Sequence, residues 1–113
     1  MKIITNPIKK DELVFLAKKK FGHLVKAVVD IKQEIIALDA ELHADLEALL
    51  LENNSRQEDL WGINFYPTQP EKKMIEFDSM INIRPSQKNR SRDVENPEIR
   101  KKIREIVKKL VIM

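Results

Sequence analysis

The sequence predicts one α+β domain, residues 1–113, with a four-stranded, mainly antiparallel sheet and helices packed mainly on one face. Two neighbouring stretches, 24–31 and 35–39, are rich in Val, Ile and Leu, as in an antiparallel hairpin. Two later stretches, 61–66 and 74–83, have strand character and end close to a proline. Segments with helical spacing of apolar residues precede, separate and follow these strands. The expected order is therefore α-β-β-α-β-β-α.

Composition places the chain among ordinary globular proteins. It has 113 residues, of which 42% are hydrophobic and 35% charged, which suits a single core. Cysteine is absent, and this excludes disulfides, thiolate zinc sites and cysteine nucleophiles. No apolar run approaches the roughly 20 residues that span a bilayer, and residues 1–7 are too short and polar for a signal peptide. We therefore expect a cytoplasmic protein without membrane association.

The first helix is expected over residues 8–21. Leu13, Leu16 and Ala17 share one face of it. Three consecutive lysines fall in its last turn, where the helix dipole favours cations. Gly22 follows as a natural stop, because glycine readily takes the left-handed conformation that ends many helices.

The segment after the hairpin, residues 40–53, fits two patterns. Leu42, Leu46 and Leu50 occur at helical spacing, but every second residue between them is also apolar, as in a strand. Most of these residues are strong helix formers, so we expect a helix. Asn54 lies in a polar stretch that ends it, since asparagine tolerates the left-handed conformation.

The strand expected over residues 74–83 has the clearest alternation in the chain. Polar residues take every second position and would face away from the core. Four apolar residues would share the core-facing side: Ile75, Phe77, Ile81 and Ile83.

The last helix has the clearest beginning. Asn96 is a favourable N-cap, and Pro97 suits the first helical position. Apolar residues at helical spacing form the expected buried stripe: Ile99, Ile103, Ile106, Val107 and Leu110.

The loop between the last strand and the last helix, residues 84–92, is unusually basic. It combines four cations with two serines, an asparagine and a glutamine. Phosphate binding uses such guanidinium, hydroxyl and amide donors, together with free backbone N–H groups near a helix N-terminus. A plain hydrophilic connection could have the same composition. The expected ligand-binding residues of the loop are Arg84, Ser86, Asn89, Arg90, Ser91 and Arg92.

Further polar residues are expected on the open face of the sheet. If the apolar residues of the last two strands face the core, Asn64, Asp78 and Asn82 face the other way. Antiparallel sheets commonly have one solvated face, which would explain these residues without a ligand. Because the last strand leads into the basic loop, we expect Asn64 and Asn82 to extend the ligand-binding site.

A small enzyme is the alternative function. His43 lies in an acidic stretch, and a histidine oriented by a carboxylate can act as a general base near neutral pH. A surface histidine beside acids at a helix start is the simpler explanation. No second histidine is placed to complete a zinc site, so no metal or cofactor is assigned. The catalytic residues of a hydrolase acting on a phosphorylated or carboxylated metabolite would be His43, Asp45, Asp59 and Asp78, with Arg84 and Arg90 as the substrate clamp.

Three blocks of the sequence resemble the signature blocks of a small uncharacterised prokaryotic protein family. They are Glu-Leu-His-Ala-Asp at 41–45, Ser-x-Gln-x-Asp-Leu-Trp-Gly-x-Asn-x-Tyr-Pro at 55–67 and Ile-Asn-Ile-Arg-Pro-x-x-x-Asn-Arg-Ser at 81–91. The resemblance extends from about residue 24 to residue 110 and implies that the polar residues of the three blocks serve one shared site. This chain departs from the family pattern at three positions where glycine is expected: Ala40, Asn54 and Lys88.

Our leading hypothesis is an anion-binding module whose ligand is a nucleotide or RNA phosphate. The chain has only one Trp, one Tyr and four Phe, and none lies in the basic loop, which argues against RNA. Convergence of His43, Asp59, Asp78 and Arg84 in one pocket would favour the enzyme instead. A homodimer through an exposed sheet edge is compatible with either function.

Overall fold

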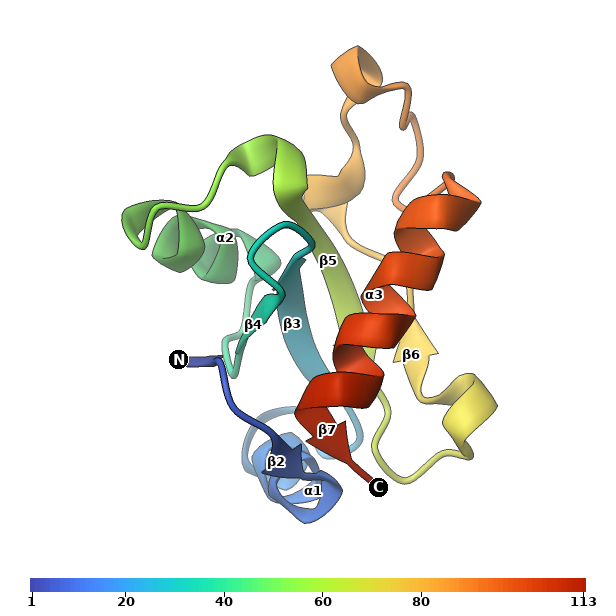
Figure 1. Ribbon diagram of the computed structural model, residues 1–113. Helices are drawn as coiled ribbons and strands as arrows, with labels where there is room; N and C mark the ends of the chain where they lie inside the picture. The colour runs from blue at the N-terminus through green and yellow to red at the C-terminus, as the bar shows by residue number, and fades with distance from the viewer.

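The computed structural model describes residues 1–113 and confirms an α+β fold built on one antiparallel sheet (Figure 1). The sheet has five strands in the order β1-β4-β3-β5-β6. Its strands are β1 (Lys2–Ile4), β3 (Val25–Asp30), β4 (Ile35–Leu38), β5 (Leu60–Phe65) and β6 (Ile75–Glu76). The helices are α1 (Lys10–Lys20), α2 (His43–Glu52) and α3 (Pro97–Leu110). None of them is both long and apolar enough to cross a membrane.

The main core lies between one face of the sheet and the helices α1 and α3. Alternate residues of β3 and β5 point into it, including Val29, Trp61 and Phe65. Helix α1 contributes Leu13, and α3 contributes Ile103, with both side chains fully buried. The expected packing of helices on this face is therefore confirmed for two of the three helices.

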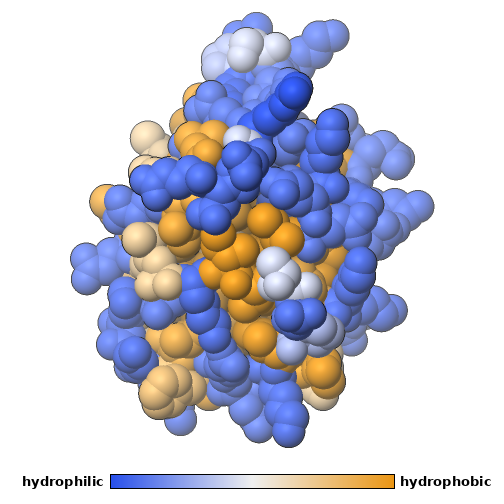
Figure 2. Space-filling view, turned by 60° about the vertical axis from the view of Figure 1, so that its left-hand side comes forward, coloured by the Kyte–Doolittle hydropathy of each residue, from blue (hydrophilic) through white to orange (hydrophobic).

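The opposite face of the sheet is covered over only part of its area. Helix α2 packs there through Leu46 and Leu50 against Val28 and Ala37, and these residues form a second, smaller core. Figure 2 shows apolar surface on the side of the molecule where α2 comes forward, surrounded by hydrophilic residues. This second core does not include the part of the face around Asn64, where a pocket lies.

The sheet differs from the expected one at both edges. The strand β1 was missed because its three residues are too few to show an alternating pattern, and its partner β4 lies far along the chain. Residues 8 and 9, expected to begin the first helix, instead form β2 (Ile8–Lys9), which pairs in parallel with β7 (Val111–Ile112). Both edge strands of the main sheet are short, so they offer few backbone groups to another chain.

The prediction of a strand over residues 74–83 is wrong beyond Glu76. Strand β6 has only two residues, and Met80–Asn82 form a 3-10 turn, η3. Ser79 begins this turn, because its hydroxyl accepts a hydrogen bond from the backbone N–H of Ile81. The alternation of apolar residues did not reveal this turn, because a side chain-to-backbone hydrogen bond has no periodic signature.

Several local predictions are confirmed. The hairpin β3–β4 forms although its turn lacks glycine, because Asp30 accepts hydrogen bonds from the backbone N–H groups of Lys32 and Gln33, each at 2.9 Å. The segment after the hairpin is helical, as α2. Asn96 caps α3 by accepting a 2.8 Å hydrogen bond from the backbone N–H of Glu98.

Two of the three positions where the family pattern expects glycine have left-handed backbone. Asn54 has φ of 71° and Lys88 has φ of 61°. Glycine takes this conformation without strain, which explains the expected residue. At the third position, Ala40 is buried in the smaller core and its neighbour Asp39 has the positive φ, 75°.

Candidate functional site

The buried side chain of Arg84 holds the end of the sheet together. Its guanidinium donates hydrogen bonds to the backbone carbonyls of Gln57, Leu60 and Ile81, and it lies 4.3 Å from the centre of the Trp61 ring. Burial lowers the pKa of Arg84 from its ordinary value, which the Glu47 carboxylate opposes. Because these contacts are internal, the guanidinium of Arg84 is committed to the fold.

Two buried asparagines fix the same region. Asn82 exchanges hydrogen bonds with the backbone of Gly62, at 2.8 and 3.0 Å, and also donates to the carbonyl of Arg92. Asn89 donates to the carbonyls of Asn82, Ser91 and Asp93. Both side chains therefore serve the conformation of the loop, and Asn82 does not face solvent as the expected strand required.

The tip of the loop already binds a carboxylate of its own chain. Glu95 Oε2 accepts hydrogen bonds from the backbone N–H groups of Arg90 and Ser91, both at 2.9 Å, and from the Ser91 hydroxyl at 2.8 Å. These bonds to Ser91 and Arg90 lower the pKa of Glu95. The side chains of Ser86 and Arg90 are exposed and make no hydrogen bond within the chain. The Arg84, Asn89 and Ser91 donors of the loop are thus occupied, whereas the Ser86 and Arg90 side chains are not.

A pocket of about 200 Å³ lies on the partly open face of the sheet, next to the start of α2. Gly62 lets the segments that carry His43 and Ser79 approach the sheet closely. A Cβ atom at Gly62 would meet Ser79 Cβ at 2.5 Å and His43 Cδ2 at 3.2 Å. The polar residues that line the pocket come from β3, α2, β5 and the segment that follows β6: Lys26, His43, Asn64, Asp78, Ser79 and Arg92.

His43 is held in one orientation at the back of the pocket. Its Nε2 lies 2.8 Å from the carbonyl oxygen of Ile63, and only a protonated Nε2 can donate there. The neutral ring therefore has an unprotonated Nδ1. Burial lowers the pKa of His43, with a smaller contribution from Lys26, while the bond to Ile63, the charge of Asp78 and a side-chain interaction with Asn64 oppose the shift. The ring is accordingly neutral at pH 7, as a general base requires.

Asn64 presents an unused acceptor to the pocket. Its Nδ2 donates to Glu76 Oε1 at 2.9 Å and to the carbonyl of Asp78 at 3.1 Å, so the amide cannot flip without placing oxygen against oxygen. The side chain is only 6% exposed, and its Oδ1 is buried without any hydrogen-bond partner in the chain. A buried acceptor without a partner is costly, and a ligand donor can satisfy it.

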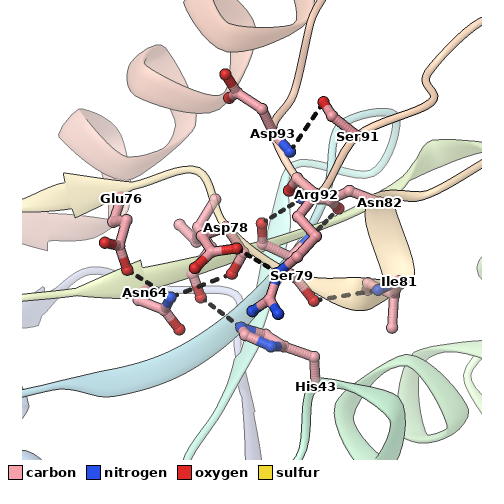
Figure 3. A network of polar contacts seen from close by, with 12 residues as sticks. His43, Asn64, Glu76, Asp78, Ser79, Ile81, Asn82, Ser91, Arg92 and Asp93 are labelled. Carbon is pink, nitrogen blue, oxygen red and sulfur yellow. Dashed lines mark hydrogen bonds and ion pairs between the residues drawn. The ribbon is translucent and has the colours of Figure 1, made fainter.

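Two cations lie at the same pocket with unused donors. The Nε of Arg92 pairs with Asp78 Oδ1 at 2.6 Å, and its other guanidinium nitrogens have no partner within the chain. Figure 3 shows this guanidinium extending from the loop toward Asp78 and toward the side of the pocket where His43 lies. The ammonium of Lys26 forms no ion pair and lies 5.4 Å from the centre of the Phe21 ring.

The structure thus brings together only part of the residues singled out from the sequence. His43, Asn64, Asp78 and Arg92 line one pocket, whereas Asp45 lies exposed on α2 and Asp59 lies in a separate 3-10 turn. Burial and the nearby Asp30 raise the pKa of Asp59, which does not line the pocket. No group of three or more His, Asp or Glu side chains is placed to hold a metal ion.

Sequence reasoning missed Lys26 and Ser79. Lys26 was hidden inside an apolar strand, where it is the only basic residue of β3 and therefore marks the face that points away from the main core. Ser79 was expected inside a strand. A serine can also begin a turn by accepting a hydrogen bond from the backbone N–H two residues later, as Ser79 does from Ile81.

The fold and the pocket define a class of protein: a small α+β domain with one polar, partly basic pocket on an incompletely covered sheet face. The chain belongs to a family described as a protein of unknown function, DUF5674, whose model matches residues 2–110. The expected membership of an uncharacterised family is therefore confirmed. No curated protein and no solved structure matches the chain.

Proposed function

We propose that the protein binds a small hydroxylated anion, a carboxylated or phosphorylated metabolite, in the pocket at His43. The observation that carries this proposal is the buried Asn64 Oδ1, which lacks a hydrogen-bond donor at a site where two cations also have unused donors. A hydroxyl of the ligand donates to Asn64 Oδ1. The anionic group of the ligand lies between Lys26 and Arg92.

The size of the pocket supports a small ligand over a nucleotide. Its volume of about 200 Å³ lies below the roughly 300 Å³ at which pockets for drug-sized ligands begin. The proposed ligand is still an anion, as in our leading hypothesis. Of the basic loop, however, only Arg92 takes part in the proposed site. Several other loop donors already serve internal acceptors, because the backbone N–H groups of Arg90 and Ser91 bind Glu95 and the Asn89 amide binds backbone carbonyls. These groups are therefore poorer candidates for a nucleotide or RNA phosphate, and of the expected loop side chains only Ser86 and Arg90 are exposed without a partner.

A hydrolytic or other acid-base reaction is the second candidate function, and the orientation of His43 favours it. A neutral imidazole with its Nε2 fixed on the Ile63 carbonyl has Nδ1 available as a base. Asp78 would not touch the ligand itself. It would orient the Arg92 guanidinium, with which it forms a 2.6 Å ion pair, toward the anionic group of the ligand. The enzyme would thus use His43, Asp78 and Arg92, and neither Asp45 nor Asp59.

Binding is tested by NMR titration of the protein with lactate and glycerol 3-phosphate. Propionate and propyl phosphate, which lack the hydroxyl groups, serve as matched ligands. We expect the hydroxylated anions to shift the backbone amide signals of Asn64, Asp78 and Arg92 in a saturable manner. The analogues should bind about tenfold more weakly or worse, because they leave the Asn64 acceptor unpaired.

Two arginines of the loop provide a matched pair of variants. Arg92→Gln removes a cation that lines the pocket, whereas Arg90→Gln removes an exposed cation two positions earlier. We expect only Arg92→Gln to weaken binding. If both variants weaken binding equally, the anions respond to the general basic surface and the proposed site is wrong. Absence of saturable binding by every probe also contradicts it.

A further inference from the structure

A second hollow, separate from the pocket at His43, lies between the C-terminal half of α3 and the segment around β6. Its volume is about 580 Å³, which lies within the range of roughly 300–1,000 Å³ typical of small-molecule sites. Figure 1 shows α3 beside β6 and the 3-10 turn before it, η2 (Glu71–Lys73). Residues 71–75 line one wall of the hollow, and residues of α3 and the chain that follows it line the other. We call this hollow the C-terminal groove.

The floor of the C-terminal groove is apolar. Met74 and Ile75 line it from one wall, and Val107 from α3 and Val111 from β7 line it from the other. Met74, Val107 and Val111 are buried, so the groove opens onto the edge of the main core. A ligand with an apolar body would cover this floor and remove it from water.

The rim of the groove is basic. Arg104 and Lys108 lie one turn apart on α3, and Lys72 faces them from η2, while Glu71 is the only acidic residue of the lining. The three cations form no ion pair within the chain, and Arg104 lies 5.0 Å from the centre of the Phe77 ring. An excess of unpaired positive charge around an apolar floor favours a ligand that is apolar at one end and anionic at the other.

We propose that the C-terminal groove binds a small amphiphilic anion, a free medium-chain carboxylate. Its alkyl chain lies on Met74, Ile75, Val107 and Val111. Its carboxylate lies at the rim among Lys72, Arg104 and Lys108. This binding is independent of the pocket at His43, with which the groove shares no lining residue.

The test uses octanoate, with 1-octanol and octylamine as probes of the same chain length and different charge. Isothermal titration calorimetry is carried out well below the concentration at which octanoate aggregates. We expect saturable, one-to-one binding of octanoate, and binding of 1-octanol that is at least about fivefold weaker because it lacks the charge. Octylamine should bind more weakly still, because its cation meets a basic rim.

Charge-reversal variants assign the site. Lys108→Glu on α3 and Lys72→Glu on η2 should each weaken octanoate binding about tenfold. Lys101→Glu makes the same change on an exposed part of α3 outside the groove and should leave binding unchanged. The use of two separate elements keeps the test valid if one variant folds poorly, and circular dichroism checks the folding of each.

Three results would overturn the proposal. One is the absence of saturable octanoate binding. Another is equal affinity for octanoate and 1-octanol, which would mean that the rim plays no part. The third is equal weakening by the Lys101→Glu control and the two groove variants, which would mean that octanoate responds to net charge alone.

Discussion

The basic loop of residues 84–92 and the pocket at His43 contain similar residue types but use them differently. In the loop, Arg84 and Asn89 donate hydrogen bonds to backbone carbonyls of the chain itself. In the pocket, Asn64 has an acceptor that nothing in the chain satisfies. Arg92, the one loop residue that also lines the pocket, has guanidinium donors without a partner in the chain. Composition attracts attention to the loop, but unsatisfied hydrogen-bonding groups distinguish a binding site from a structural one.

The largest expected effect tests the structural half of this comparison. Arg84→Ala removes the donors for three backbone carbonyls and the group stacked on Trp61. We expect the free energy of unfolding to fall by about 3 kcal/mol or more, because one buried and two partly buried carbonyls lose their partner. Urea denaturation measures this change.

Arg90→Ala is the matched control for this experiment, because the Arg90 side chain is exposed and unpaired. It should change the free energy of unfolding by no more than about 0.5 kcal/mol. If the two variants are equally stable, Arg84 is no more structural than its exposed neighbour and the comparison fails.

A smaller effect is expected from the pH dependence of His43. Burial lowers its pKa in the folded protein below the ordinary value of 6.5, so the unfolded chain binds a proton first as the pH falls. The stability contributed by the neutral ring is fully present above pH 6.5 and is lost as the pH falls toward the folded pKa. The loss cannot exceed about 1.4 kcal/mol per pH unit.

The measurement compares the parent with His43→Gln, whose amide can still donate to the Ile63 carbonyl. Urea denaturation at pH 7.5 and pH 5.5 gives the pH-dependent loss for each protein. We expect a larger loss in the parent. An equal loss in both would show that the His43 ring is not kept neutral by its surroundings.

The smallest expected effect sharpens the comparison by freeing the loop. Glu95→Ala removes the carboxylate that the Arg90 and Ser91 backbone N–H groups bind, and leaves those donors exposed. Inorganic phosphate should then shift the amide signals of Arg90 and Ser91 in NMR spectra, and should not do so in the parent. Glu98→Ala, which removes another exposed acid nearby, is the control and should behave like the parent.

Much of the fold could be predicted because its elements are local. The spacing of Leu46 and Leu50, and the capping pair Asn96-Pro97, indicated α2 and the start of α3 from neighbouring residues alone. Strand β1 and the turn at Ser79 could not be predicted in this way. Strand β1 depends on backbone hydrogen bonds to β4, which is distant in the sequence. The turn at Ser79 depends on a side chain-to-backbone hydrogen bond with Ile81, which leaves no periodic pattern in the sequence.

The candidate site was predictable to a similar degree. His43 and Asp78 stood out as titratable residues, and Asn64 as a polar residue in a strand. Arg84 stood out equally, although it is buried and its guanidinium is hydrogen-bonded within the chain. Residue type shows which hydrogen-bond donors and acceptors a side chain has. Only the three-dimensional contacts show whether these groups already have partners within the chain.

The short parallel pair of β2 with β7 has a consequence for the order of folding. It joins Ile8 to Val111, so nearly the whole chain must be in place before this contact can form. The hairpin β3–β4 and its neighbour β5 involve shorter loops and can assemble earlier, since loop-closure entropy rises with the length of the loop. During synthesis, β3, β4 and β5 emerge before α3, so the apolar residues that α3 later covers have no partner from this helix until it follows.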